Sequence, residues 1–199
     1  KSSHIISDED ALVGSTVRQN LEKKYNLKVL EKTIVQSGAR RGNKKQLVLK
    51  VAGKLHAIVV DEVMIAIGSS STTDIGLENA GVKYSDDGIL RNHKLETSAK
   101  HIYACGDVLN GNRSTGMALY QSRVVAHNIT KPKQPINLDY RAIPRVIFTS
   151  PEVACVGISK EELKEEKVTT KSAVADINVV ARKQPTSNDV GFVKLTVDK

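Results

Sequence analysis

The spacing of apolar residues changes from helical to strand-like within the first third of the chain. Apolar residues recur every four positions from Val13 to Tyr25, which predicts an amphipathic helix over residues 9–25. Ser7, with Asp10 three residues later, is expected to cap the start of this helix. Segments rich in β-favouring residues follow at 28–30, 33–36, 46–51, 57–60 and 63–67.

Two of these β-rich stretches make more specific predictions. Residues 63–67 are apolar throughout and end at Gly68. A strand that is apolar on both faces is typical of a buried parallel sheet, so we expect such a strand here. Residues 40–45 carry four basic side chains around a glycine between strand-like runs, which predicts a solvated hairpin.

Polar connectors and helical spacing alternate in the middle of the chain. Residues 74–81 end in glycine and predict a short helix, and Asp-Asp-Gly at 86–88 predicts a tight hairpin. A helix is expected over 116–129. Small residues at every fourth position from Ala118 to Ala126 would let it pack closely on a sheet.

The last part of the chain predicts a short helix and two strands. Ser-Lys-Glu-Glu at 159–162 has the pattern of a capping box. Residues 174–180 and 192–197 alternate as half-buried antiparallel strands would, and the second is expected to lie unpaired. Together these elements indicate a mixed α/β protein.

Composition narrows the function classes. The 199 residues allow one large or two small domains, and no apolar run reaches the roughly 18 residues of a membrane span. A net charge of +8 would suit a protein that binds nucleic acid, but the lysines are scattered along the chain. We therefore expect neither nucleic acid nor a membrane as a partner.

Cys105 and Cys155 lie fifty residues apart, which indicates two buried thiols in a reducing cytoplasm rather than a redox pair. The five histidines have no metal-ligand spacing.

The most informative stretch is Thr-Ser-x-x-x-Ile-Tyr-Ala-x-Gly-Asp at residues 97–107. Its strand-compatible residues lead directly into Gly106 and Asp107. Glycine permits a sharp turn and close approach of the backbone to a ligand. A carboxylate at the end of a strand is an acceptor suited to the hydroxyls of a ribose or ribityl chain.

This motif and two further blocks, at 66–82 and 140–157, occur in an order that resembles the carboxyl half of a known enzyme family. The family is that of the FAD-dependent pyridine nucleotide-disulfide oxidoreductases, in the dihydrolipoamide dehydrogenase and mercuric reductase branch. The resemblance implies an α/β (α+β overall) fold with a partial Rossmann-like domain. Residues 1–67 would be the later half of the NAD(P)-binding domain, 68–139 the returning segment of the FAD-binding domain, and 140–199 the start of the dimerisation domain.

The resemblance also implies cofactor contacts. Those to FAD are expected from Asp107, Gly106, Thr115, Met117 and Ala118. Those to NAD or NADP are expected from Ala66, Ile67, Gly68, Ser69 and Val35. The alternatives are structural: Asp107 could cap a strand end, Thr115 could cap a helix, and Val35 could be core. Ser69 stands where the family carries arginine, which weakens any charge contact with the nucleotide there.

Several family motifs are absent from these 199 residues. They are the two Gly-x-Gly-x-x-Gly loops, the Cys-x-x-x-x-Cys pair and the late His-x-x-x-x-Glu. The chain is therefore expected to be an internal piece with no catalytic residue of its own and no activity alone. The resemblance implies a homodimeric parent that passes electrons between NAD(P)H and a disulfide or dithiol such as dihydrolipoamide, or a mercuric ion, with a multienzyme complex as a further expected partner. The alternative from the residues alone is a stand-alone interaction or dimerisation module.

Overall fold

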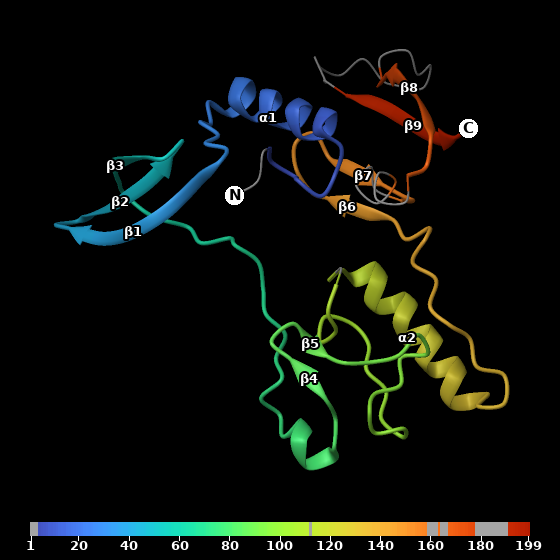
Figure 1. Ribbon diagram of the computed structural model, residues 1–199. Helices are drawn as coiled ribbons and strands as arrows, with labels where there is room; N and C mark the ends of the chain where they lie inside the picture. The colour runs from blue at the N-terminus through green and yellow to red at the C-terminus, as the bar shows by residue number, and fades with distance from the viewer. Residues whose placement is uncertain (1–3, 112, 159–162, 164–166, 178–190) are drawn as a thin grey trace. The chain divides into compact units, whose positions relative to one another are not determined.

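The computed structural model describes residues 4–111, 113–158, 163, 167–177 and 191–199 (Figure 1). They divide into two compact units. Unit 1 consists of Lys1–Ile65 and Arg145–Lys199, and unit 2 of Ala66–Pro144. Unit 2 is thus one continuous stretch, whereas unit 1 is built from two stretches of chain.

The first helix of unit 1 confirms the predicted element but not its predicted cap. Helix α1 spans Ala11–Tyr25, and its N-cap is Asp10, whose carboxylate accepts a hydrogen bond from the Leu12 amide at 2.8 Å. A carboxylate at this position satisfies a free amide and faces the positive end of the helix. Ser7 instead donates to the side chain of Asp8, so its predicted role as the cap was wrong.

A three-stranded antiparallel sheet follows in unit 1, in the order β1–β2–β3 (Figure 1). Strand β1 spans Thr33–Arg41, β2 spans Lys44–Val51 and β3 spans Lys54–Val60. The predicted solvated hairpin is confirmed, because Arg41 pairs with Lys44 across an exposed turn. Residues 28–30 form no strand, so that prediction was wrong.

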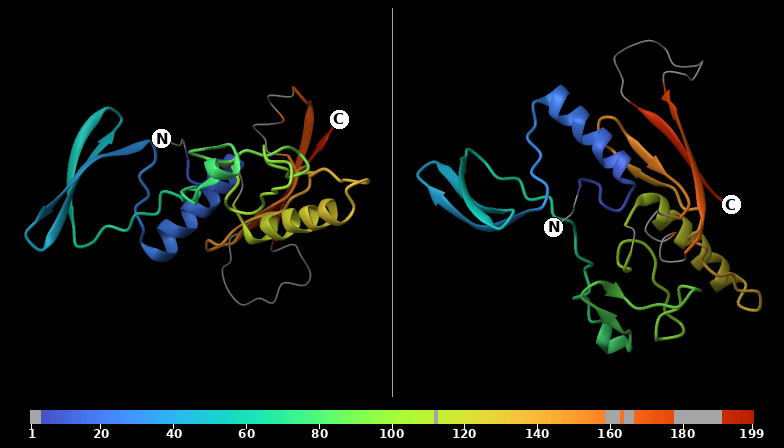
Figure 2. Two further views of the ribbon diagram at one scale, coloured as in Figure 1. Left: turned by 90° about the horizontal axis from the view of Figure 1, so that it is seen from below. Right: turned by 45° about the horizontal axis from the view of Figure 1, so that its top comes forward.

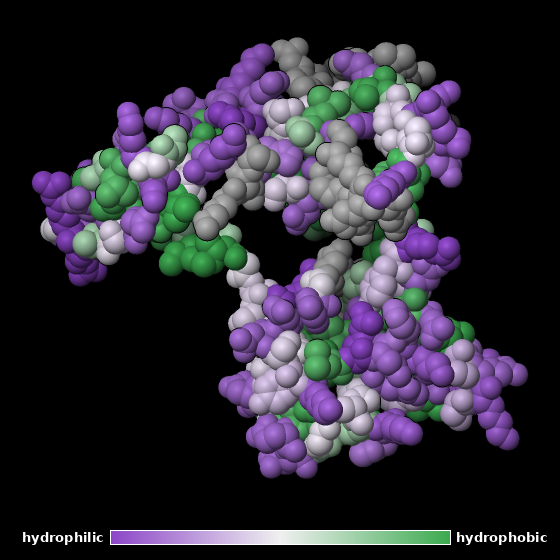
Figure 3. Space-filling view, in the orientation of Figure 1, coloured by the Kyte–Doolittle hydropathy of each residue, from purple (hydrophilic) through white to green (hydrophobic). Residues whose placement is uncertain are grey.

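The apolar run at 63–67 does not form the predicted buried strand. It is an irregular segment, and the exposed fraction of its side chains reaches 92% at Ile67. A strand is stable only when a neighbour satisfies its backbone groups, and no strand among the described residues pairs with this run. Apolar side chains of the adjacent sheet are also exposed, as the green atoms over β1–β3 show (Figure 3).

Unit 2 contains the short elements that the sequence predicts. A 3₁₀ helix at Leu77–Ala80 ends at Gly81, which confirms the predicted short helix. Strands β4 (Tyr84–Ser85) and β5 (Gly88–Ile89) form the predicted hairpin.

Helix α2 spans Thr115–Thr130, as expected, but buries a different face. The predicted stripe of small residues was wrong, since Ser122 and Ala126 are exposed. Larger side chains fill the interior instead: Met117, Gln121, Val124 and Asn128. The Asn128 side-chain amide donates to the carbonyls of Lys94 and Ile136, both at 3.0 Å, and its oxygen accepts from the Ile136 amide at 2.8 Å, so this buried polar group is bonded through both its nitrogen and its oxygen.

The core of unit 2 is one cluster of apolar side chains. It consists of Leu77, Val82, Ile89, Leu95, Ala104, Leu109, Val124 and Leu138. Leu95 is fully buried, with an exposed fraction of 0%. Because several members lie in irregular segments, this cluster holds the loops of unit 2 in place around α2.

The second stretch of unit 1 forms two antiparallel hairpins (Figure 2). Strand β6 (Arg145–Ile147) pairs with β7 (Val153–Cys155), and β8 (Thr170–Asp176) pairs with β9 (Phe192–Asp198). The antiparallel strands are confirmed, but β9 is paired rather than unpaired, and both are mostly exposed rather than half-buried. Residues 178–180 and the predicted helix at 159–162 lie outside the described residues.

Candidate functional site

The Gly106–Asp107 turn is present in unit 2, but no regular strand leads into it. Only isolated bridges flank the turn, between Tyr103 and Glu96 and between Leu109 and Ile89, so the predicted strand was wrong. Gly106 has a φ of +80°, a conformation that side chains rarely adopt. Its amide donates to the buried Gln121 side chain of α2 at 2.6 Å, which holds the turn against the helix.

Asp107 points an exposed carboxyl group from this turn. Its backbone carbonyl is bonded within unit 2, because it accepts from the Ser71 hydroxyl at 3.1 Å and from Arg113 Nε at 3.2 Å. The backbone is thus held in place while the side chain is accessible. This arrangement suits a carboxylate that accepts hydrogen bonds from a ligand.

The start of α2 lies in the same unit. Ser114 is the N-cap, and its hydroxyl accepts from the Met117 amide at 3.2 Å, so Thr115 is the first helical residue and not the cap. Thr115 and Gly116 are exposed, Ala118 is half-buried and Met117 is buried. A helix of 16 residues presents a positive end here, which favours negative charge on a bound group.

The ten predicted cofactor residues do not all belong to one unit. Val35 lies on β1 of unit 1, where 60% of it is exposed, so the alternative that it is core was wrong. The other nine belong to unit 2. The segment from Ala66 to Ser69 is exposed throughout and makes one bond relevant to the turn: the Ser69 carbonyl accepts from Arg113.

Sequence reasoning missed three residues that hold this region together. Arg113 contacts four acceptors, the Gln121 side chain bonds Gly106, and the Ser71 hydroxyl bonds the carbonyls of Asp87 and Asp107. Gln121 follows the apolar residue Met117 by four positions, so both lie on one face of α2. A polar residue on a face with buried apolar side chains was the signal that could have identified Gln121. Arg113 has no such signal, since its partners come from three separate loops.

A second glycine brings the β4–β5 hairpin against the turn. Gly88 has a φ of +133°, and a Cβ atom there would lie 2.4 Å from the Val108 carbonyl oxygen. That close approach lets the Ile89 amide donate to the same carbonyl at 2.9 Å. Any larger side chain at position 88 would separate the hairpin from the turn.

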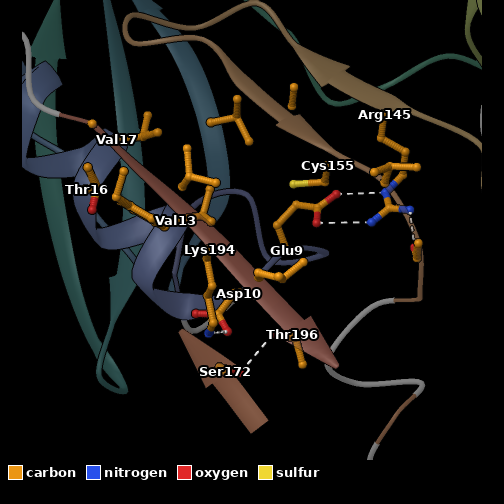
Figure 4. Close-up of a pocket in the computed structure, with 18 of the residues that line it drawn as sticks. Glu9, Asp10, Val13, Thr16, Val17, Arg145, Cys155, Ser172, Lys194 and Thr196 are labelled. Carbon is orange, nitrogen blue, oxygen red and sulfur yellow. Dashed lines mark hydrogen bonds and ion pairs between the residues drawn. The ribbon is translucent and has the colours of Figure 1, made fainter. Parts of the chain in front are cut away.

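A cavity of about 1670 Å³ lies in unit 1 and contains none of the ten predicted cofactor residues (Figure 4). Four of its charged side chains form two ion pairs. Glu9 accepts from Arg145 at 2.8 and 3.2 Å, and Asp10 accepts from Lys194 at 2.6 Å. The pairs join the start of α1 to β6 and β9, so we assign them a structural role.

Both cysteines are free thiols, and both are half-buried rather than buried as expected. Cys155 lies beside Glu9 in the cavity (Figure 4). Burial raises the pKa of the Cys155 thiol to about 11, with further contributions from the hydrogen bond to Glu9 and its charge. The described residues contain no group of side chains placed to hold a metal ion. Among them there is also no helix long and apolar enough to cross a membrane.

We expect Cys155 to react slowly with iodoacetamide at pH 7.5 in the native chain. A thiol with a pKa of about 11, against 9.0 ordinarily, carries roughly a hundredth of the reactive thiolate at pH 7.5, so alkylation should be roughly a hundredfold slower than in urea. Because the pKa of Cys155 is higher in the folded chain than in the unfolded chain, the folded chain holds this proton more tightly. The contribution of Cys155 to the free energy of unfolding is therefore fully present below pH 9 and is lost as pH rises through about 11. Mass spectrometry on a Cys105→Ser background measures this rate. Glu9→Gln should increase it, and equal native and denatured rates would contradict the assignment.

Comparison with known proteins gives two family matches. Residues 1–128 match the model of the pyridine nucleotide-disulphide oxidoreductases, and residues 143–199 match the dimerisation domain of the same proteins. Mercuric reductase from Staphylococcus aureus is 30% identical over 100% of this chain, and dihydrolipoyl dehydrogenase from Bacillus subtilis is 30% identical over 94%. The chain spans only 36% and 40% of those relatives.

Solved structures show the same fold. The HOCl-induced flavoprotein disulfide reductase RclA from Escherichia coli has a TM-score of 0.80 at 22% identity and covers 99% of this chain. LpdA from Mycobacterium tuberculosis has a TM-score of 0.83 at 20% identity and covers 100%. This chain covers 45% and 42% of those two proteins. The sequence resemblance is confirmed, and the chain belongs to the pyridine nucleotide-disulphide oxidoreductase family.

Proposed function

We propose that this chain supplies part of the FAD site of a larger flavoenzyme that passes electrons between NAD(P)H and a disulfide or metal-ion substrate. The observation that carries the proposal is the Gly106–Asp107 turn. Its backbone is held by α2 and Arg113, while the Asp107 carboxyl group is exposed. The family to which the chain belongs uses FAD and NAD(P)H.

The residues of unit 2 fit a flavin nucleotide. Asp107 would accept hydrogen bonds from ribityl hydroxyls, and Gly106 lets the backbone come close to the ligand without a side chain. Thr115, Met117 and Ala118 would act through the start of α2, whose positive end favours negative charge on the bound group. FAD, when bound, supplies the ring that accepts and releases electrons.

We propose that the segment from Ala66 to Ser69 contacts a nicotinamide nucleotide, and we propose Val35 separately as a residue that packs on adenine. All four residues of the segment are exposed, and so is most of Val35. We assign the contacts at Ile67, Gly68 and Ser69 mainly to backbone groups. We also propose residues 1–67, 68–139 and 140–199 as the NAD(P), FAD and dimerisation segments.

We infer the class of substrate from the relatives that this chain resembles. A mercuric reductase and a dihydrolipoyl dehydrogenase are equally similar to this chain, at 30% identity. We therefore propose a disulfide or dithiol such as dihydrolipoamide, or a mercuric ion. The match of residues 143–199 to a dimerisation domain supports a homodimer, and a multienzyme complex is a further proposed partner. Two free thiols suit a cytoplasmic location.

Asp107→Ala should weaken FAD binding about tenfold or more in the full-length protein that contains this chain. Hydrogen bonds to a charged group contribute roughly 1.5–3 kcal/mol, and each 1.4 kcal/mol is about tenfold in affinity. Flavin fluorescence during titration of the apoprotein measures the dissociation constant. Asp74→Ala is the matched control, an exposed aspartate of unit 2. An unchanged dissociation constant in Asp107→Ala would remove the basis of the proposal.

A further inference from the structure

We infer that Arg113 is a positioning residue that holds the Gly106–Asp107 turn in place for the flavin. The inference rests on the proposed FAD site, because it explains how this chain keeps that site in shape. Arg113 itself need not contact the cofactor.

The guanidinium of Arg113 joins three loops of unit 2. Nη1 donates to the Ser69 carbonyl, Nη2 donates to the Asp87 carbonyl at 3.1 Å, and Nε donates to the Asp107 carbonyl at 3.2 Å. Nη2 also donates to the Ser71 hydroxyl at 2.9 Å. The segment after Gly68, the turn of the β4–β5 hairpin and the Gly106–Asp107 turn therefore meet at one side chain.

The chemistry of these contacts favours arginine over lysine. Its planar fork carries five N–H donors in fixed directions, whereas a lysine ammonium is a point charge with three donors. Three of the four acceptors are backbone carbonyls, which no substitution of their own side chains would remove. Among the described residues no carboxylate forms an ion pair with Arg113, so its donors serve the backbone of the loops.

The Ser71 hydroxyl completes the arrangement. It donates toward the same two carbonyls, of Asp87 and Asp107, each at 3.1 Å. The carbonyl of Asp107 is thus bonded from two sides, by Ser71 and by Arg113. Because the Asp107 side chain extends from that same residue, fixing its carbonyl limits the directions in which the carboxylate can point.

The first test measures local opening in the full-length flavoprotein. Arg113→Met should speed hydrogen exchange of the Ile89 and Leu109 amides by tenfold or more, because their bonds to Val108 and Gly106 lie next to the freed carbonyls. Arg113→Lys should restore part of the protection. Arg141→Met is the matched control, since it removes an exposed ion pair with Asp139 from the same unit. Unchanged exchange in Arg113→Met would overturn the inference.

The second test is a double-mutant cycle with FAD as the probe. Arg113→Met should raise the FAD dissociation constant about tenfold. Adding it to Asp107→Ala should raise that variant's constant less than threefold, because both changes disable one group. If the two single effects multiply, the FAD dissociation constant of the double variant would rise about hundredfold. That result would show that Arg113 does not act through Asp107.

The outcomes separate the inference from the proposed function. If Asp107→Ala binds FAD normally while Arg113→Met still exchanges faster, the FAD assignment fails and the role of Arg113 in holding the loops remains. If Arg113→Met does not fold, exchange in Arg113→Lys decides. Acceleration of at least threefold at the same two amides supports the inference, and wild-type rates overturn it.

Discussion

Truncation of Leu95 to alanine should destabilise unit 2 by about 3 kcal/mol, within the roughly 2–5 kcal/mol typical of buried leucines. Leu95 is fully buried within the apolar cluster, so the change removes apolar contacts and leaves a cavity. Leu95 also has a φ of +66°, which costs a non-glycine residue about 1 kcal/mol and which alanine would not relieve.

Hydrogen exchange of the α2 amides in the full chain measures this loss within unit 2. Leu90→Ala is the control, because half of Leu90 is exposed and its truncation should cost less than about 1 kcal/mol. A loss below 1 kcal/mol for Leu95→Ala would mean that the cluster collapses around the shortened side chain or does not form.

Arg145→Met should destabilise unit 1 by about 2–3 kcal/mol. The change leaves the Glu9 carboxylate, only 8% of which is exposed, without its bidentate partner. Removing one member of a fully buried pair costs about 3–5 kcal/mol, and we expect a loss at or below the bottom of that range because 30% of the Arg145 side chain is exposed. Exchange of the α1 amides measures the effect.

The double variant Glu9→Met/Arg145→Met separates the cost of a lone charge from the value of the pair. Two apolar side chains can replace a buried pair at little cost, so the double variant should recover most of the stability. Lys44→Met serves as the control, because it removes an ion pair with Asp61 in the same unit, 59% of the Lys44 side chain is exposed, and such pairs contribute about 0–1 kcal/mol. A double variant less stable than Arg145→Met would contradict this account.

Local signals in the sequence predicted local structure well. The period of four from Val13 identified α1, and Asp-Asp-Gly at 86–88 identified the β4–β5 hairpin. These elements depend on neighbours within a few residues. The predicted N-cap of α1 was wrong because the side chains of both Ser7 and Asp10 can cap a helix. The backbone geometry, which the sequence does not show, places Asp10 at the N-cap.

The features that could not be predicted depend on contacts between residues that are far apart in the sequence. Residues 63–67 have the composition of a buried strand, yet composition does not say whether a neighbouring strand is present to pair with them. Likewise, Ala118 and Ala126 have helical spacing, but the cluster around Leu95 selects the face with Met117 and Val124.

The candidate site shows the same division. Asp107 and Gly106 were found because both residues belong to one short motif. Arg113 was missed because its acceptors lie up to 44 residues away in sequence, in loops whose carbonyls carry no sequence signal. Backbone acceptors are the same at every position, so only the fold identifies them.

Unit 1 consists of two stretches of chain separated by unit 2, so its two parts are synthesised at different times. Glu9 and Arg145 are 136 residues apart, and a ribosome adding about 5–20 residues per second needs roughly 7–27 s to make the intervening chain. All of unit 2 is made in that interval, so its apolar cluster can form first. Helix α1 leaves the ribosome before either hairpin that it contacts exists. Until Arg145 and Lys194 are synthesised, the ion pairs of Glu9 and Asp10 cannot form, and the 15-residue helix that follows these two residues is only marginally stable by itself.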